Sequence, residues 1–345
     1  MEFTQYNLIL TDNCNLRCTY CFDNLYSNRD CNSNTKIMTE DMIPNILHFA
    51  EQTASTKLPI TFNMFGGEPL ANWKFFKSFV EITNSHFKHE HKFITTINGT
   101  LLNSKIIDFL AKNKVEIAVS LDGIEESNKA RITIDGKPTW NSIMQILPEI
   151  KAKIPKTILL MVIGKHNYKY LYENCKFFNK LEFNYNVNWN MEDDYTKEEL
   201  EEIEKQLKRV KEEGLVQPNN VIKNNNKEDG TVCLPADKAI TIAPNGKLYF
   251  CHQFVPKMID TEDLSYGNIK DGITNEELYN NFVDRTYFFS WSKDKKIICN
   301  SCDIKEDCRG GCIADQWHKD KDFLKIRKSV CDFSRINFNI KEDCK

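Results

Sequence analysis

Long apolar runs, a dominant charge and a secretion signal are all missing from this chain of 345 residues. No apolar run approaches the length of a membrane span, and the first residues lack the basic and apolar regions of a signal peptide. The formal net charge is only −3, which excludes a bulk electrostatic attraction to nucleic acid or to a membrane surface. Internal repeats and low-complexity tracts are absent as well. We therefore expect a cytoplasmic protein that binds neither nucleic acid nor membrane.

Disulfides are not expected either, although the chain has thirteen cysteines. The cytoplasm keeps thiols reduced, so a cysteine content this high needs another explanation there. Ten of the thirteen fall into clustered, regularly spaced groups. This pattern favours metal ligation over disulfide bonding.

Residues 6 to about 214 alternate between strand-like and helix-like segments. The strand candidates are short and mostly apolar, as parallel strands covered on both faces should be: residues 7–10, 60–64, 93–97, 116–121, 157–163 and 182–187. Six β–α units predict an α/β fold, an open, partial (β/α)6 TIM-like barrel. In such barrels the functional loops follow the carboxyl ends of the strands.

Helix starts are marked in the same stretch. Thr39 and Asn103 are predicted N-caps, and Thr196 with Glu199 has the spacing of a capping box.

The chain is expected to change character after the barrel. Residues 217–231 are polar and turn-rich and are interpreted as a linker. Residues 239–243 and 247–251, joined by Pro-Asn-Gly, predict a β-hairpin. The predicted domains are thus the barrel over residues 1–216 and a smaller cysteine-rich domain over residues 232–345.

A C-x3-C-x2-C motif, Cys14, Cys18 and Cys21, follows the first predicted strand. Iron–sulfur clusters usually have four thiolate ligands, so three on one loop would leave one iron open to a small molecule. Structural zinc is the alternative, but it needs four closed ligands, and no nearby His or Cys completes this set. The motif therefore favours a cluster that serves as a reaction centre.

This motif resembles the cluster loop of the radical S-adenosylmethionine (SAM) superfamily. In that family SAM chelates the open iron, and one electron from the cluster cleaves it to methionine and a 5′-deoxyadenosyl radical. Further strand-end segments are similar to the family's GGEP, TNGT and SLDG elements and to its arginine for the SAM carboxylate. The SAM contacts that the resemblance implies are Tyr20, Gly66, Gly67, Glu68, Asn98, Ser120, Asp122 and Arg131.

The last third of the chain resembles the SPASM domain, which holds two auxiliary iron–sulfur clusters in a subset of this superfamily. The resemblance implies an outer cluster on Cys299, Cys302, Cys308 and Cys331, and an inner cluster on Cys233, Cys251 and Cys312. Fully ligated members have another cysteine shortly before the first of these seven, and residues 224–232 contain none. The inner cluster is therefore expected to have an open iron, a different nuclearity or a rescuing ligand such as Cys344. Cys31 and Cys175 are interpreted as spare.

SPASM enzymes catalyse different reactions on peptides and proteins. The largest group forms thioether or carbon–carbon crosslinks in ribosomally made peptides, and this is our hypothesis for the chain. Formation of formylglycine in sulfatases is the alternative. Sulfatase-maturing members place an aspartate proton acceptor directly after the second SPASM cysteine, where this chain has His252. Histidine can also act as a base at neutral pH, so His252 is the candidate catalytic base, with a structural role as the competing interpretation.

A cluster-bearing electron carrier or a zinc-stabilised interaction module would be a non-enzymatic alternative. It explains the last third of the chain, but neither function needs the three-cysteine loop or the polar strand ends. The expected partners are a peptide or protein substrate and an electron donor such as ferredoxin or flavodoxin. Since the first strand starts within about ten residues, we expect no fused leader-binding domain, so leader binding would need a separate protein or direct recognition by the barrel and linker.

Overall fold

The computed structural model describes residues 2–21, 36–190, 193–215, 238–255, 264–286, 301–304, 308, 312–322 and 325–342. Contacts divide the chain into two compact units, neither of them continuous in sequence. The first unit comprises Met1–Ser120, Arg131–Thr157 and Asp237–Phe282, and the second comprises Leu121–Ala130, Ile158–Ala236 and Val283–Lys345.

The first unit is built on a sheet whose described strands lie in the order β10-β9-β8-β7-β1-β2-β3-β4. Their bounds are β1 (Gln5–Ile9), β2 (Ile60–Phe65), β3 (His91–Ile97), β4 (Glu116–Ser120), β7 (Ala239–Ile242), β8 (Lys247–Tyr249), β9 (Gly267–Asn268) and β10 (Gly272–Ile273). Strands β1 to β4 pair in parallel, and β7 joins the other edge of β1, also in parallel. From β7 to β10 the pairing is antiparallel.

Alternating side chains of this sheet form an aromatic core. Phe62 of β2 lies in register between Tyr6 of β1 and Phe93 of β3. Its ring stacks with both, at centroid distances of 5.7 and 6.1 Å, and all three residues are buried. Because side chains alternate between the two faces of a strand, this core fixes which residues point the other way.

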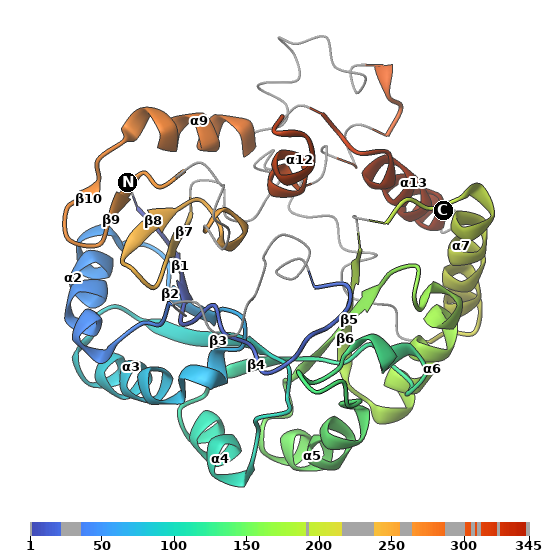
Figure 1. Cartoon of the computed structure of the whole chain (residues 1–345), viewed down its shortest axis with the longest axis horizontal. Helices are drawn as coiled ribbons and strands as arrows, with labels where there is room; N and C mark the ends of the chain where they lie inside the picture. The colour runs from blue at the N-terminus through green and yellow to red at the C-terminus, as the bar shows by residue number, and fades with distance from the viewer. Residues whose placement is uncertain are drawn as a thin grey trace. The chain divides into compact units, whose positions relative to one another are not determined.

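Helices cover the sheet of the first unit. They are η1 (Glu40–Met42), α2 (Ile43–Thr53), η2 (Pro69–Asn72), α3 (Trp73–His86), α4 (Ser104–Lys112), α5 (Trp140–Lys153) and η5 (His252–Phe254), and α9 (Glu276–Thr286) begins here. Figure 1 shows α4 and α5 side by side. Asn103 caps α4 as predicted, through a 3.1 Å hydrogen bond from the Ile106 N–H. Thr39 is the N-cap residue of η1, but its side chain makes no capping hydrogen bond, so that prediction is wrong in its mechanism.

The predicted hairpin after the linker is confirmed. Strands β7 and β8 pair around the turn Pro244-Asn245-Gly246, and Gly246 has the positive φ of 79° that glycine tolerates best. Through β7 this hairpin extends the sheet of β1.

The second unit contains the parallel pair β5 (Ile158–Ile163) and β6 (Asn184–Trp189). Its helices are η3 (Ser127–Ala130), η4 (Tyr168–Tyr170), α6 (Leu171–Leu181), α7 (Lys197–Glu212), α12 (Ile313–Asp320) and α13 (Lys328–Glu342). Helix α7 starts with the predicted capping box of Thr196 and Glu199 and packs against both α6 and α13.

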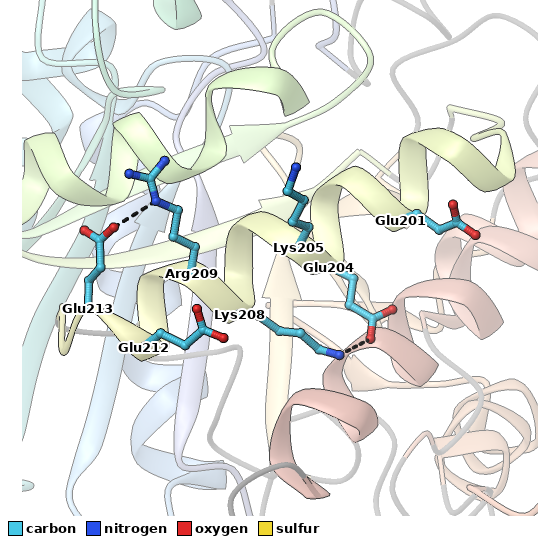
Figure 2. A pocket seen from close by; sticks show the side chains of 7 residues that line it. All are labelled: Glu201, Glu204, Lys205, Lys208, Arg209, Glu212 and Glu213. Atoms are coloured by element: carbon cyan, nitrogen blue, oxygen red, sulfur yellow. Dashed lines mark hydrogen bonds and ion pairs between the residues drawn. The ribbon is translucent and has the colours of Figure 1, made fainter.

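The outer face of α7 lines a surface pocket of about 580 Å³. Figure 2 shows that its lining is entirely charged, with ion pairs from Lys208 to Glu204 at 3.1 Å and from Arg209 to Glu213 at 2.8 Å. None of the predicted site residues lines it. Pairs of this kind at i, i+4 spacing are typical of a solvated helix face. Among the described helices, none is long and apolar enough to cross a membrane.

Candidate active site

The three-cysteine loop follows β1, at the carboxyl end of that strand. Cys14, Cys18 and Cys21 are half-buried thiols, and no disulfide joins them. The Arg17 guanidinium donates to the carbonyls of Cys14 and Leu16 at 2.8 and 2.7 Å, and the Cys21 N–H donates to the Cys18 carbonyl at 3.1 Å. The loop therefore folds back on itself at the end of β1, but among the residues that the structure describes no group of three or more His, Cys, Asp or Glu side chains is arranged to hold a metal ion.

The sulfur of Cys14 already receives hydrogen-bond donors. The Leu16 N–H lies 3.4 Å from this Sγ, and the side-chain amide nitrogen of Asn98 lies 4.0 Å away. Amide N–H groups around a cysteine stabilise the thiolate form that binds metals and clusters. A donor set of three thiols, one of them with such donors, fits an iron–sulfur cluster.

Gly66 and Gly67 let the end of β2 lie directly against the start of this loop. A Cβ on Gly66 would come within 2.4 Å of the Thr11 carbonyl oxygen, and one on Gly67 within 2.3 Å of the Asn13 oxygen. The Gly67 and Glu68 N–H groups donate to those same carbonyls at 2.9 and 2.8 Å. These glycines therefore allow the end of β2 to lie close to the backbone of Thr11 and Asn13. Their contact with SAM stays a prediction.

Glu68 is a buried carboxylate that links the carboxyl ends of β2 and β3. One oxygen accepts the Leu70 N–H at 3.0 Å, and the other accepts the Asn98 N–H at 2.7 Å. Burial raises the pKa of Glu68 to about 7, although the two N–H donors lower it. Each carboxylate oxygen can accept a second hydrogen bond, so the chemistry of Glu68 is compatible with an additional ammonium donor.

Arg131 is connected to the cysteine loop through a short backbone pairing. The Arg17 N–H donates to the Ile132 carbonyl at 2.7 Å, and Leu16 forms a bridge with Thr133. The Arg131 guanidinium lies over the Tyr20 ring, 5.4 Å from its centroid. The structure thus brings together two predicted SAM contacts that are more than a hundred residues apart in the sequence.

Residues 8–178 of the chain match the family model described as the radical SAM superfamily. The chain carries a radical SAM domain. With this domain come its cofactors, SAM and iron–sulfur clusters, for which the chain has the cysteines.

Relatives of the chain include a cyclopropyl synthase and a sulfatase-maturating enzyme. The radical SAM cyclopropyl synthase TigE of Paramaledivibacter caminithermalis is 23% identical, over 95% of this chain and 72% of that protein. The cysteine-type anaerobic sulfatase-maturating enzyme of Clostridium novyi is 28% identical over 51% of this chain. That match covers 47% of the relative, so the chain spans about half the length of the sulfatase-maturating proteins it matches.

The solved structures of anSMEcpe share the fold. The one with bound AdoMet has a TM-score of 0.79 at 19% identity and covers 99% of this chain and 97% of its own. Another, with AdoMet and the Cp18Cys peptide, has a TM-score of 0.76 and covers 99% of both chains. This likeness confirms the predicted α/β fold with its partial barrel, and the part of the chain after residue 231 is rich in cysteines.

Ser120 and Asp122 belong to different units of the fold. Ser120 is the half-buried last residue of β4 in the first unit. Asp122, in the second unit, is fully buried, and its carboxylate accepts the Val162 N–H of β5 at 2.9 Å. Its backbone is held by Ser127 and Asn128, at 2.8 and 3.1 Å. Contact of Ser120 and Asp122 with SAM stays a prediction.

His252 lies beside the end of β2. It follows Cys251, the N-cap of η5, and its ring centroid is 4.6 Å from that of Phe65, directly before the two glycines. Nearby, the buried hydroxyl of Tyr266 has no hydrogen-bond partner among the described residues. Burial is the main cause that raises the pKa of Tyr266, and electrostatic interactions with Tyr279 and Cys251 raise it further. A buried donor close to Cys251 is compatible with an inner cluster at this cysteine.

Three of the four predicted outer-cluster cysteines interact in the second unit. Partial burial is the main cause that raises the pKa of the Cys331 thiol. The electrostatic effects of the neighbouring Cys308 and Cys302 raise it further. Arg335, one turn after Cys331 on α13, forms a bidentate ion pair with Asp303, at 3.0 and 2.6 Å. The ion pair connects the Cys302 segment to the helix that carries Cys331.

Of the remaining six cysteines, two lie among the described residues and four do not. Cys312 is the N-cap of α12, and Cys175 is buried in α6, where burial raises the pKa of its thiol to about 12. Four cysteines lie outside the described residues, as does the predicted linker: Cys31, Cys233, Cys299 and Cys344.

Sequence reasoning missed the polar residues that support the thiols. Asn15 and Thr100 bond to Asn98, and Asp303 with Arg335 connects two cysteine segments. Asn15 stands inside the C-x3-C-x2-C motif, and Asp303 directly follows Cys302. Position next to a ligand cysteine was the available signal for Asn15 and Asp303, and position in the TNGT-like segment was the signal for Thr100.

Proposed function

We propose that this chain is a radical SAM maturase that oxidatively modifies a side chain of a ribosomally made peptide, by a thioether or carbon–carbon crosslink. The observation that carries the proposal is the three-thiol loop at the end of β1, with N–H donors at the Cys14 sulfur. When bound, the cluster and SAM supply a carbon-centred radical that removes a hydrogen atom from the substrate. Relatives that include a cyclopropyl synthase and sulfatase-maturating enzymes support this class of reaction.

The residues of this chain have separable roles in the proposal. Cys14, Cys18 and Cys21 hold the cluster. Arg131, held close to the loop and over Tyr20, binds the carboxylate of SAM, and its planar guanidinium favours bidentate contact. Glu68 keeps the ends of β2 and β3 together beside the loop.

Sulfatase maturation is the second candidate, and His252 is the observation that favours it. Its ring lies against Phe65, next to the glycines at the end of β2. An imidazole there has the chemistry to accept a proton at neutral pH. In this alternative the substrate is a sulfatase, and its cysteine or serine becomes formylglycine.

The first test is SAM cleavage by the anaerobically reconstituted protein. We expect formation of 5′-deoxyadenosine, and its loss when Cys14, Cys18 and Cys21 are all replaced by alanine. Cys175→Ala is the matched control, because this thiol is buried in α6, and it should retain cleavage. Cleavage by the triple variant would contradict the assignment of the cluster loop.

The second test identifies the substrate. Anaerobic co-expression with small open reading frames adjacent to the gene, followed by mass spectrometry, should yield a peptide that has lost two hydrogen atoms. Unchanged peptides together with a modified sulfatase would favour the second candidate. A His252→Ala variant that still modifies the peptide would remove His252 as the base.

A further inference from the structure

Three polar side chains close a ring of hydrogen bonds beside Cys14. The Asn98 amide nitrogen donates to the Asn15 side-chain oxygen at 2.8 Å, and the Asn15 amide nitrogen donates to the Thr100 hydroxyl at 2.8 Å. The Thr100 hydroxyl completes the ring by donating to the Asn98 side-chain oxygen at 2.7 Å. Each member is both a donor and an acceptor, so the ring is closed.

The ring determines which way the Asn98 amide faces. Its oxygen accepts from the Thr100 hydroxyl and also from the Thr100 N–H, at 2.9 Å. The amide nitrogen therefore points the other way, toward the Asn15 oxygen and the Cys14 sulfur, which lies 4.0 Å from it. With a flipped amide, the Asn98 nitrogen would face the Thr100 N–H, which can only donate, so the hydrogen-bond pattern favours the orientation described.

The ring is not needed to hold the loop. Arg17 bonds within the loop, and the Gly67 and Glu68 N–H groups bond to Thr11 and Asn13 just before Cys14. The end of β3 is separately fixed by the Asn98 N–H at Glu68. What the ring adds to these contacts is the orientation of one amide.

Hydrogen bonds to the sulfurs of an iron–sulfur cluster help to set its reduction potential, because they stabilise negative charge on the thiolate. We propose that Asn15 and Thr100 are positioning residues that aim the Asn98 amide at the Cys14 sulfur and thereby raise the reduction potential of the cluster on the three-cysteine loop. The inference rests on the proposed function, since it requires that cluster.

The test uses the full reconstituted protein and four variants. Asn15→Leu removes one member of the ring, and Thr100→Val removes a single hydroxyl at nearly constant shape. Thr100→Ser keeps the hydroxyl and is the conservative variant. Asn84→Leu is the matched control, because Asn84 pairs with Asn113 at 3.1 Å on the surface, away from the cysteine loop.

The measurement is a redox titration followed by electron paramagnetic resonance, using the signal that SAM perturbs so that auxiliary clusters do not interfere. We expect Asn15→Leu and Thr100→Val to shift the one-electron reduction equilibrium about three- to tenfold toward the oxidised cluster, and tenfold corresponds to about 59 mV. Thr100→Ser and Asn84→Leu should match the wild type.

Wild-type potentials in Asn15→Leu and Thr100→Val, at wild-type iron content, would overturn the inference. If Asn15→Leu fails to fold or to take up iron, the comparison of Thr100→Val with Thr100→Ser decides by the same readout. Failure of the proposed function looks different: the wild type itself would then show no SAM-perturbed signal.

Discussion

Trp189 at the end of β6 stacks on Phe333 of α13, with ring centroids 4.4 Å apart and planes inclined by only 17°. Phe333 is 2% exposed, and Tyr195 packs against it edge-on, at 5.0 Å. Phe333 lies two residues after Cys331, so this contact joins the α/β part of the second unit to a predicted outer-cluster ligand. Replacing Phe333 with alanine should lower the free energy of unfolding by about 3–5 kcal/mol.

Denaturant unfolding of anaerobic protein, followed by circular dichroism, would measure that loss. Phe333→Leu, which keeps most of the apolar volume, should cost clearly less. An equal loss in both variants would mean that the aromatic contacts, and not the burial of apolar volume, account for the contribution of Phe333.

Arg131 is expected to be a determinant of SAM affinity. Arg131→Gln removes a charge-assisted contact. The binding free energy of SAM should therefore become less favourable by about 1–3 kcal/mol. Arg131→Lys should recover only part of it, because an ammonium cannot form the bidentate pair. Lys137→Gln is the control, since this exposed lysine pairs with Asp135 in the same segment. Anaerobic equilibrium dialysis with labelled SAM is the measurement, and unchanged affinity in Arg131→Gln would refute the role.

Glu68 should give the stability a distinctive pH dependence. Burial raises the pKa of Glu68 from 4.5 to about 7, so the folded state binds this proton more tightly than the unfolded state. Between about pH 4.5 and pH 7 the contribution of Glu68 to stability therefore falls as pH rises, by about 3 kcal/mol in total. Urea unfolding of the wild type and of Glu68→Gln across this range isolates the effect, because other groups are common to both. A stability difference that does not change with pH would contradict the prediction.

The Asp303–Arg335 ion pair is expected to retain the outer cluster. Arg335→Gln frees the segment of Cys302 from α13 and leaves the Asp303 carboxylate beside thiolates without its cation. We expect iron to be lost to a chelator about two- to fivefold faster than from the wild type, a modest effect for an exposed pair. Lys197→Gln is the matched control, because Lys197 pairs with Glu201 at 3.4 Å on the exposed face of α7. Equal rates in the two variants would remove the special role of Arg335.

Much of the fold was predictable because its signals are local. Short apolar runs predicted β1 to β6 closely, and the box of Thr196 and Glu199 predicted the start of α7, since both depend on residues a few positions apart. Thr39 shows the limit of such reasoning. A residue type that favours capping does not guarantee the bond, and here the helix begins with a short 3-10 turn.

The cysteine loop was predictable for the same reason, whereas its supporting contacts were not. The Asn15–Thr100 bond spans 85 residues, and the Asp303–Arg335 pair spans 32. The residues next to Asn15 or to Asp303 contain no signal that predicts which distant residue each will bond. Glu68 is a comparable case: its motif was visible, but its bond to the Asn98 N–H follows from the parallel alignment of β2 and β3.

The pairing of β1 with β7 has a consequence for how the chain is made. Asn7 and Thr241 lie side by side in register although 234 residues separate them, so β1 leaves the ribosome well before β7, the strand that completes its edge. Until then β1 presents unpaired backbone groups along one side, which is the surface that recruits other strands in aggregation. During synthesis the cluster loop is thus attached to an unfinished sheet until β7 has emerged, and a lower expression temperature, which weakens hydrophobic association, should favour soluble protein.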